Sequence, residues 1–137
     1  LSNKIDAMLK KNIPVTLVSI DSDGLKRIND TLGHDMGDKV IQSLGYAIEQ
    51  SLRKSDYGIR PGGDEFLLIL IDTDYAKSLE IIARIKENLR HTDKDPRVSF
   101  SHGNYPLKPG DSLESAIKKS DKLLYVHKRN KYGEAAQ

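Results

Sequence analysis

Cysteine and tryptophan are both absent from this chain of 137 residues. Without cysteine there are no disulfide bonds, thiolate metal sites or cysteine nucleophiles, and a reducing, cytoplasmic location is expected. Long apolar runs are missing too: none approaches the roughly 20 residues of a membrane-spanning helix, so we expect no membrane contact by this domain. The 22 basic residues nearly balance the 20 acidic ones. A net charge of +2 is too small to indicate a nucleic-acid partner. Any phosphate ligand must therefore be bound by a local group of residues.

What the chain does contain suits one ordinary globular domain. Hydrophobic residues make up 37% and charged residues 31%, and the length is enough to bury a sheet against several helices. The sequence opens at Leu1 without an initiator methionine or a signal-peptide pattern. We therefore expect residues 1–137 to be a single domain excised from a longer protein, with an N-terminal regulatory part such as a sensor or receiver domain.

Hydrophobic periodicity predicts helices alternating with strands. The expected helices are 1–11, 25–31, about 38–54, about 75–90, and one that runs from a capping box at 111–114 to about 131. The expected strands are 15–20, 57–60, 66–71 and 98–101. Gly33 and Gly37 are expected to break the chain before the long helix. The helix after Asp74 is expected to bury one stripe, made of Leu79, Ile82, Ile85 and Leu89.

The order of these elements predicts an α+β fold. Two of the strands flank the short segment 61–65 and so form an antiparallel hairpin with charged residues at its tip. The first strand, 15–20, is apolar nearly throughout, which is typical of a central strand. We expect a central, mainly antiparallel sheet flanked by helices, with the first strand beside the hairpin.

Acidic residues follow the first strand and occupy the tip of the hairpin. If these strands are neighbours, Asp21 converges with Asp64 and Glu65 on a carboxylate cluster suited to Mg²⁺ and a nucleoside triphosphate. Gly62 and Gly63 would let the backbone approach a bulky ligand. Each segment also has a plainer interpretation: the turn after Asp21 as a solvated turn or helix cap, and the two glycines as an ordinary hairpin turn.

Several motifs in order resemble the GGDEF domain family of diguanylate cyclases. The resemblance covers residues from about 15 to 131. The motifs that carry it are RPGGDEF at 60–66, DSDGLKRIND at 21–30, Gly33-His34, Gly37-Asp38, VSFSHG at 98–103, and Asp121, Leu124-Tyr125 and Lys128. The resemblance implies the palm-like nucleotidyl cyclase fold and the condensation of two GTP molecules into cyclic di-GMP and two pyrophosphates. It also implies a homodimer, because each domain would hold one GTP.

The resemblance assigns a metal site and a catalytic pair. Metal ligands would be Asp21, Ser22 through its carbonyl, Asp64 and Glu65, with Mg²⁺ as the ion and Mn²⁺ as the alternative. Asp64 and Glu65 would be the catalytic residues, Asp64 acting as general base.

The resemblance also assigns the nucleotide contacts. Asn29 and Asp38 would read guanine, Lys26 and Lys128 would face the phosphates, and Gly62 and Gly63 would lie against the substrate. His34 would border the guanine pocket. The alternatives are a cap or turn for Asn29, the N-cap of the long helix for Asp38, solvated charges for the two lysines, and a structural role for His34.

A second site is implied by the Arg53-to-Asp56 segment. Its RxxD placement before Gly62 is that of the family's product-binding inhibitory site, and Arg84 stands at the spacing of a further arginine of that site. Cyclic di-GMP would be the ligand, since guanidinium groups bind phosphates and guanine edges. A surface ion pair is the alternative.

Two positions depart from the family pattern. Leu25 replaces the usual Phe, which keeps an apolar anchor. Tyr132 stands where many members carry an arginine that contacts phosphate, with Arg129 or Lys131 as the substitutes. The rival hypotheses are a degenerate domain that binds cyclic di-GMP or GTP as a sensor, and another palm-like cyclase that acts within one nucleotide.

Overall fold

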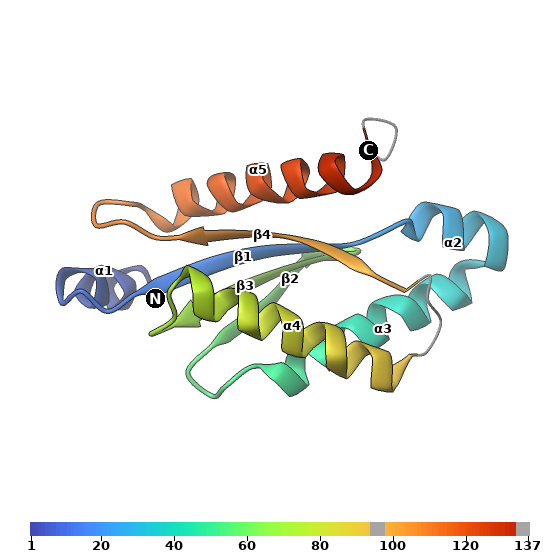
Figure 1. Cartoon of the computed structure of the whole chain (residues 1–137), viewed down its shortest axis with the longest axis horizontal. Helices are drawn as coiled ribbons and strands as arrows, with labels where there is room; N and C mark the ends of the chain where they lie inside the picture. Colours follow the sequence, from blue (N-terminus) through green and yellow to red (C-terminus); the bar gives the residue numbers. More distant parts are fainter. Residues whose placement is uncertain (94–97, 134–137) are drawn as a thin grey trace.

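The computed structural model describes residues 1–93 and 98–133 and confirms the α+β class (Figure 1). In chain order the elements are α1 (Ser2–Lys10), β1 (Val15–Ser22), α2 (Leu25–Leu32), α3 (His34–Ser51), β2 (Tyr57–Gly62), β3 (Glu65–Ile71), α4 (Tyr75–Thr92), β4 (Phe100–Pro106) and α5 (Leu113–Tyr132). The described strands form one sheet in the order β2-β3-β1-β4, with every pair antiparallel. The first strand and the hairpin are therefore neighbours, as expected.

Helices cover both faces of the sheet, and each face carries its own core. Helices α3 and α4 pack on one face, while α1 and α5 lie on the other (Figure 1). Along β1 the side chains alternate between the two, because successive residues of a strand point to opposite faces. Val18 and Ile20 belong to the α3/α4 core, and Val15 and Leu17 to the α1/α5 core. β1 is buried on both faces, which explains its nearly continuous apolar sequence.

The long helix begins earlier than the sequence predicts. It starts at His34 rather than near Asp38, and it ends at Ser51. Gly37 does not break the chain: it is buried inside α3, where a Cβ would overlap the Asn29 side chain of α2. The glycine therefore serves close helix–helix approach, and Asp38 is not the N-cap.

The last strand is longer than predicted, and it begins later. Residues 98–99 lie outside it, and pairing with β1 extends to Pro106, opposite Thr16. The prediction failed because polar residues, Gly103 and Pro106 make this segment resemble a loop. An edge position tolerates a proline, since no further strand needs its missing N–H.

Two smaller expectations about helices were wrong. Leu79 of α4 is 39% exposed, and Ile81 is buried in its place, because the true stripe runs through Ser78, Ile81, Ile82 and Ile85. In α5 the cap lies one residue later than the predicted capping box at 111–114 implies: the N-cap is Ser112, whose side chain accepts a hydrogen bond from the Ser115 amide.

Gly103 is the tightest point between the sheet and α5. A Cβ at this position would lie 2.8 Å from the Leu123 carbonyl carbon and overlap Leu124 N and Ser120 O, all of which are backbone atoms. We expect Gly103→Ala to lower the free energy of unfolding by about 1–3 kcal/mol, because α5 must move outward. Denaturant unfolding followed by circular dichroism measures this loss.

Gly45→Ala is the matched control for that variant. Its Cβ would make ordinary contact with Phe66 at 3.5 Å, and it replaces a helical glycine by a better helix former. We expect an unchanged or slightly raised stability. Equal losses in the two variants would contradict the account of Gly103.

Candidate functional site

The end of β1 and the tip of the β2–β3 hairpin lie together. Asp21 pairs with Glu65 across the two strands, and the Ser22 amide donates to the Asp64 carbonyl at 3.3 Å. Ser22 Oγ also donates to Asp64 Oδ2 at 3.5 Å. The structure therefore places the end of β1 next to the hairpin tip.

The Asp21 carboxylate is the most perturbed group of this site. Its Oδ2 accepts a hydrogen bond from Lys128 Nζ at 2.7 Å, whereas its Oδ1 is buried without a hydrogen-bond partner. Burial and the nearby Asp64 carboxylate raise the pKa of Asp21 to about 7, although Lys128 opposes this shift. A half-buried carboxylate of raised pKa beside a second carboxylate is a place where a cation would be stabilising.

The acidic residues fit a divalent ion only in part. In the stretches 1–93 and 98–133, no three His, Cys, Asp or Glu side chains are gathered closely enough to hold one. Asp21 and Asp64 do face each other, and the unpartnered Asp21 Oδ1 offers a hard oxygen ligand. Glu65 lies across from Asp21 on β3, and its Oε2 is 3.9 Å from where a Cβ on Gly62 would lie.

The hairpin tip consists of Gly63 and Asp64 between the two strands. Arg60 braces it by donating from Nε to the Gly63 carbonyl at 3.0 Å. Gly63 has open space around it, with no heavy atom of the described residues within 4 Å of where a Cβ would lie. The tip therefore combines a fixed backbone with an unobstructed surface.

The residues predicted to read guanine lie where α2 meets α3. Asn29 packs against Gly37, which immediately precedes Asp38, so the two predicted readers are brought to one helix–helix junction. Asp38 is exposed in the first half of α3, and so is His34 at its start. The exposed side chains leave this junction accessible to a ligand.

The two predicted phosphate-binding lysines differ in their surroundings. Lys128 of α5 is largely buried and paired with Asp21, so it is not a solvated charge. Lys26 is exposed in the first turn of α2. This turn follows Gly24, whose φ of 65° is in the left-handed region that favours glycine.

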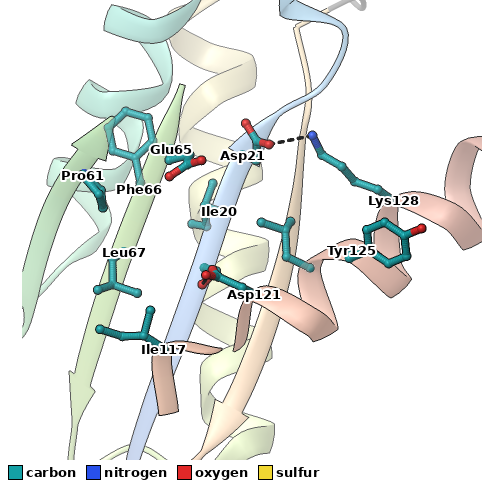
Figure 2. Close-up of a pocket in the computed structure, with 12 residues that line it drawn as sticks. Ile20, Asp21, Pro61, Glu65, Phe66, Leu67, Ile117, Asp121, Tyr125 and Lys128 are labelled. Carbon is teal, nitrogen blue, oxygen red and sulfur yellow. Dashed lines mark hydrogen bonds and ion pairs between the residues drawn. The ribbon is translucent and has the colours of Figure 1, made fainter. Parts of the chain in front are cut away.

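A cavity of about 460 Å³ opens beside Asp21, between the sheet and α5 (Figure 2). Asp21, Glu65 and Lys128 line its polar end. Its remaining lining residues are Ser19, Ile20, Pro61, Phe66, Leu67, Ile117, Asp121, Leu124 and Tyr125. Asp121 accepts a hydrogen bond from Ser19 Oγ at 2.7 Å. Sequence reasoning missed Ser19 as a lining residue, because nothing in an apolar strand marks one serine as facing a cavity.

The Arg53–Asp56 pair exists, but it is not a simple surface ion pair. The side chain of Asp56 is 0% exposed, while that of Arg53 is 47% exposed. Asp56 accepts hydrogen bonds from the Arg53 guanidinium at 3.1 Å and from the Ile71 amide at 3.1 Å. Arg84 approaches from α4 and donates to the Ser51 carbonyl at 3.4 Å. Asp56 therefore orients Arg53, whose guanidinium remains partly exposed beside a cavity of about 480 Å³.

Tyr132 has a partner that the sequence did not predict. Its hydroxyl donates to Asp23 Oδ2 at 2.9 Å, and Lys131 Nζ donates to the same oxygen at 2.7 Å. Hydrogen bonds from Lys131, Ser101 and Tyr132 lower the pKa of Asp23 despite its burial. The second Asp of the 21–23 segment was the available signal for this cluster.

An antiparallel α+β sandwich with carboxylates and Lys128 gathered at the end of β1 is typical of nucleotidyl cyclase domains of the palm-like fold. Residues 1–134 match the family model of the diguanylate cyclase GGDEF domain, and the chain belongs to this family.

Known relatives agree with this assignment. "Probable diguanylate cyclase DgcJ" of Escherichia coli is 44% identical over 96% of this chain and 26% of its own length. Diguanylate cyclase DosC of Escherichia coli is 33% identical over 85% of this chain and 26% of its own length. The GGDEF domain of DgcB from Caulobacter crescentus, solved in complex with c-di-GMP, superposes with a TM-score of 0.83 at 25% identity, covering 95% and 81% of the two chains. The present chain thus spans about a quarter of the curated relatives' length.

None of the described helices of this chain combines the length and the apolar character that a membrane span requires.

Proposed function

We propose that this domain is a diguanylate cyclase that condenses two GTP molecules into cyclic di-GMP. In each half-reaction the 3′-hydroxyl of one GTP attacks the α-phosphorus of the other, the bond to the bridging oxygen breaks, and pyrophosphate leaves. The observation that carries the proposal is the convergence of Asp21, Asp64 and Lys128 beside an open cavity, in a chain of this family.

The carboxylates would supply the metal site and the base. Asp21, Ser22, Asp64 and Glu65 would hold Mg²⁺, which supplies charge neutralisation at the phosphates when bound; Mn²⁺ is the alternative ion. Asp64 accepts the proton of the attacking hydroxyl. The hydrogen bonds between Ser22 and Asp64 keep this base next to the end of β1.

The remaining residues would bind and orient GTP. Asp38 accepts hydrogen bonds from the guanine N1–H and amino groups, which adenine does not offer in this arrangement. Asn29 would contact the guanine beside it, and His34 would border the same pocket. Lys26 and Lys128 neutralise the phosphates. The bare backbone of Gly62 and Gly63 lets the nucleotide lie close to the hairpin.

The reaction requires two copies of the chain. Each domain has one hairpin tip and one β1 end, so one domain presents one GTP to another. We propose a catalytic homodimer in which the two sites face each other. The acceleration then comes mainly from positioning two nucleotides and from electrostatic stabilisation.

Incubation with GTP and Mg²⁺, followed by chromatography of the nucleotides, tests the activity. Cyclic di-GMP and pyrophosphate are the expected products, and the specific activity should rise with enzyme concentration across a dilution series. Absence of both products would overturn the enzyme proposal in favour of a domain that only binds nucleotide. A cyclic mononucleotide would indicate a cyclase acting within one GTP.

A regulatory site for cyclic di-GMP is proposed at Arg53, Asp56 and Arg84. The partly exposed Arg53 guanidinium, oriented by Asp56 beside a cavity, supports it. Isothermal titration with cyclic di-GMP measures the binding. We expect Arg84→Ala to weaken it, since among residues 1–93 and 98–133 the Arg84 guanidinium is engaged in one long hydrogen bond.

Divalent cation affinity should fall as the pH is lowered through 7. With its pKa raised to about 7, Asp21 is mostly protonated below that pH, and a protonated carboxyl is a poor ligand. We expect binding of Mn²⁺, measured calorimetrically without nucleotide, to be about tenfold weaker at pH 6 than at pH 8. In Lys128→Met the dependence should move to higher pH, because Lys128 lowers this pKa. A flat profile between pH 6 and 8 would contradict the prediction.

A further inference from the structure

Asp23 is the centre of a buried hydrogen-bond cluster next to the proposed active site. It is only 6% exposed. Its Oδ1 accepts from Ser101 Oγ at 2.6 Å. Its Oδ2 accepts from Ser99 Oγ at 2.9 Å, Lys131 Nζ at 2.7 Å and Tyr132 OH at 2.9 Å. Both oxygens are thus engaged within the protein, so Asp23 acts through these contacts.

The cluster joins three parts of the chain that are distant in sequence. Asp23 lies in the turn between β1 and α2, and Lys131 and Tyr132 end α5. Ser99 immediately precedes β4, and Ser101 lies within it. Backbone contacts reinforce the connection: the Asp23 amide donates to the Ser99 carbonyl at 2.9 Å, and Lys131 Nζ donates to the Phe100 carbonyl at 3.1 Å. The end of α5 is therefore attached to the turn and to the edge strand together.

Helix α5 also contacts the end of β1, through a lysine three residues earlier in the helix. Lys128 pairs with Asp21, and Lys131 pairs with Asp23. Residues three apart lie on the same face of a helix, so α5 presents both lysines to this turn. The position of Lys128 relative to Asp21 thus depends on how the end of α5 is anchored.

We propose that Asp23, Lys131 and Tyr132 are positioning residues that hold the 21–25 turn and the end of α5 in the geometry in which Asp21 and Lys128 engage GTP. This role rests on the proposed cyclase function. Tyr132 stands where many members of the family carry an arginine, and here its hydroxyl reaches the nucleotide site through Asp23. The contact keeps the turn in place while leaving Lys128 as the lysine directed at the phosphates.

Hydrogen exchange of the ligand-free protein tests the anchoring without reference to activity. In Tyr132→Phe, which removes only the hydroxyl, we expect amides 22–25 to exchange at least about threefold faster than in the wild type. The matched control is Tyr105→Phe. The Tyr105 hydroxyl donates to Asp111 at 2.6 Å and accepts from Lys119 at 3.2 Å, near the opposite end of α5. This control should leave exchange of the 22–25 amides unchanged.

Binding and kinetics test the consequence for function. We expect Tyr132→Phe and Lys131→Met to weaken Mn²⁺–GTP binding and to raise KM for GTP by about three- to tenfold, while kcat changes by less than threefold. Lys131→Arg should restore most of the loss, because an arginine also donates to Asp23. Tyr105→Phe should not change KM.

The outcomes separate this inference from the proposed function. If the wild type forms no cyclic di-GMP, the cyclase proposal fails, while the exchange experiment still decides the anchoring. If the wild type is active and Tyr132→Phe matches Tyr105→Phe in both exchange and KM, the positioning role is wrong. Loss of stability alone, equal in the two phenylalanine variants, would also overturn it.

Discussion

Replacing Asp64 by asparagine is expected to lower the rate of cyclic di-GMP formation by about 1,000-fold or more. The substitution keeps the shape of the side chain but removes the proposed general base and one carboxylate of the metal site, and each of these losses is costly. The rate is measured from initial velocities at saturating GTP and Mg²⁺. The fold should be retained, because the side chain of Asp64 lies at a hairpin tip and outside both cores.

Asp21 provides a second measurement on this variant. The Asp64 carboxylate contributes to the raised pKa of Asp21, so the neutral asparagine should lower that pKa toward its ordinary value, as an NMR titration would show. The matched control is Asp6→Asn, an exposed aspartate of α1, which should leave both rate and pKa unchanged. Residual activity of Asp64→Asn within tenfold of the wild type would remove Asp64 from the catalytic role.

Replacing Asp56 by alanine is expected to cost about 2–4 kcal/mol of unfolding free energy, since hydrogen bonds to charged groups are lost and a buried donor is left unpaired. The Ile71 amide and the Arg53 guanidinium both donate to this inaccessible carboxylate. For a domain of this size, we expect the melting temperature to fall by roughly 5–15 °C. Thermal unfolding followed by circular dichroism measures the change.

Two comparisons sharpen this prediction. Asp56→Asn keeps one acceptor oxygen and should lose less stability than the alanine variant. Arg84 belongs to the same proposed inhibitory site, but among the described residues it makes one long hydrogen bond. The melting temperature of Arg84→Ala should therefore stay close to that of the wild type. A melting temperature of Asp56→Ala within about 2 °C of the wild type would show that the carboxylate has no structural role.

This result would change how the inhibitory site is studied. A lost response to cyclic di-GMP in Asp56→Ala would combine a binding defect with a weakened junction between the end of α3 and the end of β3. Arg84→Ala separates the two effects, because the exposed Arg84 side chain contributes to that junction a single 3.4 Å hydrogen bond, to the Ser51 carbonyl at the end of α3. Regulation is therefore better tested at Arg84 than at Asp56.

Local signals were enough to predict most of the fold. The hairpin was predicted because two expected strands flank a glycine-rich tip, and the central position of β1 because its apolar residues are nearly continuous. Both features depend on residues close in sequence. β4 was predicted poorly because its identity depends on pairing with residues of β1 that lie 78 to 90 positions earlier, from Ser22 opposite Phe100 to Thr16 opposite Pro106. Composition does not record that pairing, and Gly103 and Pro106 obscure it.

The candidate site divides in the same way. Neighbouring residues encode strand ends and tight turns, so the amino-acid order was enough to predict which residue types stand at the end of β1, at the hairpin tip and in the 53–56 segment. Which charges meet depends on how the elements pack. In the folded protein Lys128 pairs with Asp21, and the Asp56 side chain is buried. Lys131 and Tyr132 both donate hydrogen bonds to Asp23. The pairings of Asp21 and Asp23 exist only once α5 has packed on the sheet, whereas Asp56 is buried by its contacts with Arg53 and the end of β3.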